Sequence, residues 1–133
     1  MWTQPGLKDN SEFAVKILKK DNVMVQNTIE KIEDKIRTNV SLSEINRAEL
    51  LDLLAKLKPE ILELANAKTE HAEIITGFIE RSTHEVMRRE KNPDLLKIAV
   101  NGLSASVKGF EVSHPELTEN VNYMANALAN MGI

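Results

Sequence analysis

The sequence predicts an all-α protein of four to five amphipathic helices, arranged as a helical bundle or a coiled-coil-like assembly. Three observations predict this fold class. Apolar residues make up 42% and charged residues 28% of the 133 positions, whereas aromatic residues make up 4% and glycine and proline are few. Apolar side chains recur at spacings of three and four along most of the chain, which is the period of one helix face. Helix-capping residues separate these periodic segments.

The chain length fits one domain or one extended helical unit. Residues 1–9 contain a proline and a glycine before any periodic pattern begins, and we expect them to form a flexible N-terminal arm. Residues 10–40 are predicted to be a long coiled-coil-like helix. Residues 41–133 are predicted to be a helical bundle region with a kink or break at Pro59.

The first helix carries a narrow apolar seam with the a/d spacing of a coiled coil. Because most other positions are polar, we expect a partner helix to bury the seam and the protein to be a homo-oligomer. An asparagine at an a position commonly fixes register and oligomeric state. Alternatively, the seam packs inside its own chain and the asparagine caps the helix or faces water. The predicted contact residues of this helix are Val15, Leu18, Asn22, Val25, Ile29, Ile32 and Ile36.

A second helix is predicted to begin at Ser41. Ser41 and Glu44 have the spacing of a capping box, and Val40 and Ile45 have that of a hydrophobic staple.

The helical pattern then continues to residue 91, interrupted only by Pro59. A proline ring clashes with the carbonyl group four residues before it. An unbroken helix over residues 42–91 would be about 75 Å long. The segment is therefore expected to be either a hairpin broken at Pro59 or a rod that buries its apolar face by assembly.

The next helix is predicted over residues 94–110, with Asn92 as its cap and Pro93 at its start. Small residues on this helix predict close approach of a neighbour. The dipeptide Asn101-Gly102 leaves a β-hairpin as the alternative, because Asn-Gly is a strong signal for a two-residue turn.

The last helix is predicted to start at a second capping box, Ser113 to Glu116, and to end at Gly132. Its polar face is mostly asparagine, which loses less on desolvation than charged residues do, so we expect a subunit or partner contact here. The predicted contact residues of its apolar seam are Leu117, Val121, Met124 and Leu128.

The segment Phe110-Glu111-Val112-Ser113-His114-Pro115-Glu116-Leu117-Thr118 and the ending Ala127-Leu128-Ala129-Asn130-Met131-Gly132-Ile133 resemble the C-terminal part of a family of small bacterial all-helical proteins of unknown function. The resemblance implies a prokaryotic, all-helical protein. It brings no catalytic or binding residues.

Charge and composition disfavour several functional classes. The net charge of −3 disfavours binding to nucleic acid or to an anionic membrane. The absence of cysteine excludes thiolate metal sites and fits a cytoplasmic location. His71, His84 and His114 stand in no recognised ligand array, and no glycine-rich phosphate loop or nucleophile motif is present. We therefore expect no enzyme activity, no cofactor and no metal.

The function predicted from the sequence is a non-enzymatic scaffold, assembly or adaptor protein that acts through helix-helix contacts. Its expected partners are itself, as a homo-oligomer, and another protein. Two alternatives remain: a carrier of a small apolar ligand within a helical bundle, and a peripheral membrane-surface protein that uses an amphipathic helix.

Overall fold

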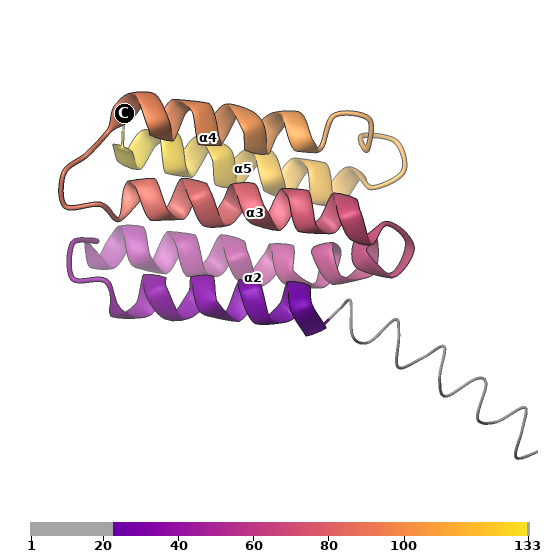
Figure 1. The fold of residues 1–133 in the computed structure, drawn as a ribbon, viewed down its shortest axis with the longest axis horizontal. Helices are drawn as coiled ribbons and strands as arrows, with labels where there is room; N and C mark the ends of the chain where they lie inside the picture. Colours follow the sequence, from indigo (N-terminus) through magenta and orange to yellow (C-terminus); the bar gives the residue numbers. More distant parts are fainter. Residues whose placement is uncertain (1–22, 133) are drawn as a thin grey trace, which may run out of the picture.

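The computed structural model describes residues 23–132, which form five helices and no strand (Figure 1). The first helix is described over residues 23–38, and four further helices follow it. The all-α fold is confirmed, and the alternative of a β-hairpin about Asn101-Gly102 is wrong because both residues lie inside a helix. The later helices are α2 (Glu44–Ala67), α3 (Thr69–Val86), α4 (Pro93–Ser106) and α5 (Pro115–Gly132).

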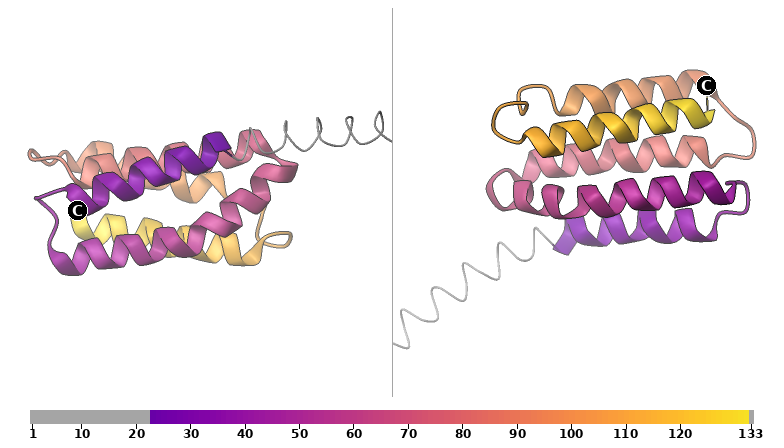
Figure 2. Two further views of the ribbon diagram at one scale, coloured as in Figure 1. Left: turned by 90° about the horizontal axis from the view of Figure 1, so that it is seen from below. Right: turned by 180° about the vertical axis from the view of Figure 1, so that it is seen from behind.

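The helices pack in two layers around one core. Figure 2 shows α2 and α5 in one layer and the first helix, α3 and α4 in the other. Helix α2 packs against α3 and α5, and α5 also packs against α4 and α3. Lys58 of α2 pairs with Glu30 and Glu33 of the first helix, at N–O distances of 3.8 and 3.9 Å. The interior between the layers is filled by aliphatic side chains from all five helices.

The two predicted seams lie in this core. The described residues of the first seam, and all four residues of the last-helix seam, are almost completely buried by the chain itself. The expectation that a second chain is needed to bury them is therefore corrected. Two layers of helices from one chain shelter the narrow stripes. The buried residues are Val25, Ile29, Ile32, Ile36, Leu117, Val121, Met124 and Leu128. Val15, Leu18, Asn22 and the expected arm at residues 1–9 lie outside the described residues.

Helix α2 starts later than the sequence predicted. Ser43 is the N-cap, and its hydroxyl oxygen accepts a hydrogen bond from the Asn46 amide at 3.1 Å. The predicted capping box at Ser41 is wrong, because the Ser41 amide instead donates to the Asn39 side chain at 2.9 Å. The predicted staple is also wrong, since Val40 and Ile45 are 95% and 80% exposed.

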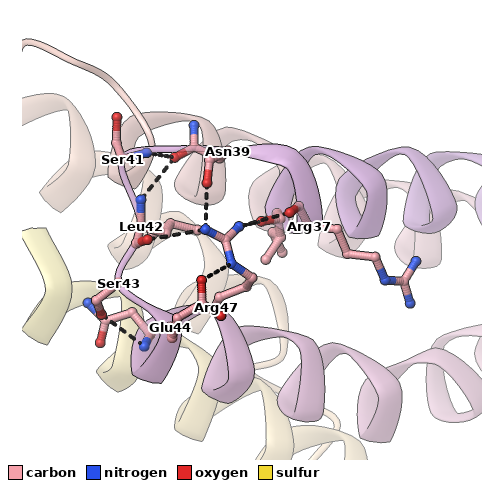
Figure 3. A network of polar contacts seen from close by, with 9 residues as sticks. Arg37, Asn39, Ser41, Leu42, Ser43, Glu44 and Arg47 are labelled. Atoms are coloured by element: carbon pink, nitrogen blue, oxygen red, sulfur yellow. Dashed lines mark hydrogen bonds and ion pairs between the residues drawn. The ribbon is translucent and has the colours of Figure 1, made fainter.

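Arg47 fixes the connection between the first helix and α2 (Figure 3). Its guanidinium group donates to carbonyl oxygens at the C-terminal end of the first helix and in the turn, groups that have no partner within a helix. It also lies 3.5 Å from a carboxylate oxygen of Glu44. The four carbonyl acceptors are those of Ile36, Arg37 at 3.1 Å, Asn39 at 2.6 Å and Leu42 at 3.2 Å.

The hairpin within residues 42–91 turns at Lys68 and not at Pro59. Pro59 lies inside α2, and Figure 2 shows the second half of α2 bending towards the layer of the first helix and α3. A proline inside a helix removes one hydrogen bond and clashes one turn back, which bends the helix. Lys68 has a non-helical backbone (φ −141°), and its amide donates to the Leu64 carbonyl at 2.7 Å. The rod alternative is therefore wrong.

Local signals position the last two helices well. The Asn92 side chain accepts a hydrogen bond from the Leu95 amide at 3.2 Å, and Pro93 is the first residue of α4. Helix α4 ends at Ser106, four residues before the predicted end, and the chain then turns through Gly109 (φ +97°). Helix α5 begins at Pro115 and extends to Gly132. The capping box predicted at Ser113 is not formed, since this hydroxyl lies 3.0 Å from Nδ1 of His114.

Replacement of Arg47 by alanine is expected to lower the free energy of unfolding by about 2–4 kcal/mol, because several carbonyl groups lose their donor. Arg47→Lys should recover only part of this loss, since an ammonium group cannot reach all four carbonyls at once. Urea denaturation followed by circular dichroism measures both values. Glu44→Gln is the control: the carboxylate is exposed, and its loss should cost less than about 0.5 kcal/mol. Equal losses for Arg47→Ala and Glu44→Gln would contradict this role.

Candidate docking groove between helices α3 and α4

Exposed apolar side chains gather on the outer face of α3 and α4. Ile98 is 66% exposed, and Ile74 and Leu95 are also exposed beside it. Met24 of the first helix is also exposed and lies beside Glu73 and Gly77 of α3. Other exposed large apolar residues of the described part are dispersed over other surfaces: Val40, Ile45, Val112 and Tyr123.

Ile74, Leu95 and Ile98 line an open groove of about 490 Å³ between α3 and α4. Its lining is mainly apolar, and Glu73 and Arg81 are the charged residues on it. This size lies within the range of sites that bind small molecules or a few side chains of a partner. The residues that line the groove are Glu73, Ile74, Gly77, Phe78, Arg81, Leu95, Ile98 and Ala99.

Two glycines shape the groove, for different reasons. A Cβ atom at Gly102 would lie 2.3 Å from the ring of Phe78, so this glycine allows Phe78 to pack against α4. A Cβ atom at Gly77 would meet no atom within 4 Å. A glycine inside a helix costs about 1 kcal/mol relative to alanine. Packing explains that cost at Gly102, but no packing within the described chain explains it at Gly77. The backbone of α3 is bare at Gly77.

A second, smaller hollow of about 270 Å³ lies on the other side of Gly77, between α3 and the first helix. Met24, Val25 and Thr28 line it from the first helix, and Glu80 is among its α3 residues. Glu73 and Gly77 line both hollows. The bare backbone at Gly77 is therefore open from two sides, beside the carboxylates of Glu73 and Glu80.

A cluster of polar and aromatic groups lies near the α2–α3 turn. The rings of His71 and His114 contact Phe110 edge to face, with centroid separations of 5.4 and 5.7 Å. Nζ of Lys68 lies 5.3 Å from the centre of the same ring. These contacts join the segment after α4 to the start of α3.

Glu60 and Glu116 are neighbouring carboxyl groups of α2 and α5 near this cluster. Partial burial raises the pKa of Glu60 above its usual value, and a hydrogen bond with Glu116 and repulsion from Glu116 and Glu63 raise it further. The nearby His114 lowers the pKa of Glu60.

Within residues 23–132, no group of three or more histidine, aspartate or glutamate side chains is arranged so that it could hold a metal ion.

The groove does not contain the contact residues predicted from the sequence. Those that are described lie in the core. Asn122, Asn126 and Asn130 of α5 are exposed on another helix, and Asn120 is half-buried. The sequence did carry two signals for the groove. Ile74 and Ile98 are apolar residues outside the buried stripes of their helices, and Gly77 stands inside a helix without an evident reason.

Residues 79–133 match a family described as a domain of unknown function (DUF4404). The match begins in the second half of α3 and includes α4, α5 and the C-terminal segment that carries the resemblance described above. It relates this part of the chain to a family of uncharacterised proteins. No curated protein and no solved structure matches the chain. None of the helices in residues 23–132 is both long enough and apolar enough to cross a membrane.

Gly77→Ala is expected to raise the free energy of unfolding by about 1 kcal/mol, because alanine favours the helix and the new methyl group enters open space. Gly102→Ala is expected to lower it by about 1 kcal/mol, because overlap with the Phe78 ring exceeds the same helical gain. Chemical denaturation of the two variants measures both changes. A stabilised Gly102→Ala variant would contradict the packing of Phe78 described here.

Glu60→Gln is expected to stabilise the protein at pH 7 by less than about 1 kcal/mol, a small effect because the site is largely solvated. A raised folded-state pKa means that the contribution of Glu60 to stability is fully present below its unfolded-state pKa and is lost as the pH rises through the folded-state value. The gain from Glu60→Gln should therefore disappear below pH 4.5, the ordinary pKa of the group.

Thermal denaturation between pH 3.5 and 8 tests this dependence. Glu49→Gln, at an exposed position of the same helix, is the control. If both variants changed stability equally at every pH, the interaction of Glu60 with Glu116 would not be the cause.

Proposed function

We propose that this protein is a non-enzymatic scaffold or adaptor that acts through helix-helix contacts, and that the groove between α3 and α4 is its contact surface. One observation carries the proposal. Exposed apolar side chains border a helix backbone left bare by Gly77, which nothing in the described chain covers. Exposed apolar surface of this kind marks sites of interaction.

A helix is the partner element that suits this surface. The groove runs between two adjacent helices, and an amphipathic helix can place residues at i, i+3, i+4 and i+7 into such a groove. A glycine backbone allows a second helix to approach closely, since no side chain holds it away. Self-association through this surface makes the protein a homo-oligomer, and the same surface suits a helix of another protein.

The proposal includes a cytoplasmic location and a bacterial origin. The lack of cysteine supports the location. The C-terminal motif and the matched domain of uncharacterised proteins support membership of the resembled family.

A second candidate function is the transport of a small apolar ligand. The volume and the largely apolar lining of the groove favour this candidate. The alternative of a peripheral membrane-surface protein would need an amphipathic helix that is detached from the bundle. Among residues 23–132 every helix packs into the bundle, so this part of the chain does not offer such a helix.

Ile98→Asp is expected to weaken self-association at least about tenfold, because a carboxylate in the groove would have to be desolvated on binding. Light scattering over a range of protein concentrations measures the change in mass. Val112→Asp is the matched control, since Val112 is 94% exposed outside the groove.

Asn126→Lys tests the polar face of α5 in the same assay. A decrease in mass for Asn126→Lys and none for Ile98→Asp would place the contact on α5. If all variants and the wild type remained monomeric while the wild type bound a fluorescent apolar probe that Ile98→Asp did not, the carrier function would be favoured instead.

A further inference from the structure

We infer that the groove between α3 and α4 of one copy receives the N-terminal segment, residues 10–22, of a second copy of this chain. The inference rests on the proposed function and names the partner of the same surface.

The N-terminal segment joins the described structure at the edge of the groove. Met24 is 57% exposed and lines the smaller hollow together with Glu73 and Gly77. Glu73 and Gly77 also line the groove itself. The segment is long enough to span the groove: 13 helical residues are about 20 Å long, and the groove lining extends only from Glu73 to Arg81 along α3.

The direction of the first helix favours a second copy over the same copy. The first helix and α3 run in the same direction, because two reversals of the chain separate them (Figure 1). Met24 lies beside Glu73 and Gly77, so a helix continued from residue 23 towards residue 10 would pass the start of α3 and leave its own groove behind.

The chemistry of the segment complements that of the groove. Drawn as a helix, residues 10–22 carry Phe13, Ile17 and Leu18 on one side. Lys16 and Lys20 lie along the edge of this side next to Phe13, and Asp21 lies on it near its C-terminal end. The apolar face suits the side chains that line the groove. Because Lys16 and Lys20 border the inserted side, they suit the carboxylates of Glu73 and Glu80, which stand beside Gly77, and Asp21 suits Arg81 of the groove lining.

Complementation between two full-length variants tests the inference. Ile17→Asp damages the segment and leaves the groove intact, whereas Ile98→Asp damages the groove and leaves the segment intact. We expect each variant alone to be monomeric, and an equimolar mixture to form dimers, because one intact segment and one intact groove remain in each mixed pair. Val112→Asp should behave as the wild type. Gly77→Ala should weaken self-association about tenfold although it does not destabilise the fold.

The outcomes separate this inference from the proposed function. If Ile98→Asp lowers the mass and Ile17→Asp does not, the groove is a contact surface but its occupant is not the N-terminal segment. If the mixture of the two variants stays monomeric, segment and groove do not meet between copies. If neither variant changes the mass of the wild type, both the inference and the proposed function fail.

A disulfide experiment identifies the copy that supplies the segment. The natural chain has no cysteine, so Ile17→Cys and Ile98→Cys introduce unique thiols. Oxidation of the mixed single variants is expected to yield a covalent dimer joining the two kinds of chain. A chain that carries both substitutions and forms only an internal disulfide would overturn the assignment to a second copy.

Discussion

The burial of narrow aliphatic stripes by one another is the constraint on which the rest of the structure depends. Each helix carries a narrow apolar stripe that one neighbouring helix cannot bury completely. The chain also has few aromatic residues to fill the space between helices. Two layers solve this problem, because each stripe then meets more than one other helix. The α2–α3 turn, the bend of α2 and the position of the first helix all follow from keeping these stripes inside one core.

The sequence predicted the fold class and several helix ends because residues that are close together in the sequence determine these features. Asn92 and Pro93 mark the start of α4 through one side-chain hydrogen bond and one fixed backbone angle. The turn at Lys68 has no such mark. It has neither glycine nor proline, and it forms because Leu64 before it and Ala72 after it must both enter the core. A local sequence pattern cannot predict a turn that depends on packing between residues far apart in the sequence.

The site was harder to predict than the fold, for a related reason. A narrow apolar seam has the same spacing whether its neighbour belongs to the same chain or to another. Ile29 and Leu117 therefore resembled interface residues, although both are fully buried within one chain. The residues that remain available, such as Ile98, interrupt the polar face of a helix, and a single residue of this kind is common on protein surfaces. Only the folded arrangement shows that Ile74, Leu95 and Ile98 lie around one groove.

Gly102 and Gly77 differ in what takes the place of the missing side chain. At Gly102 the missing side chain is replaced by the ring of Phe78, so the loss of helix propensity is offset inside the molecule. At Gly77 nothing in the described chain replaces it, and the local helix is weaker than alanine would make it. Natural proteins retain such losses where function needs the space. The backbone at Gly77 is accessible because α3 and α4 pack into the core through their opposite faces, and the proposed partner helix would therefore contact Gly77 without unfolding α3.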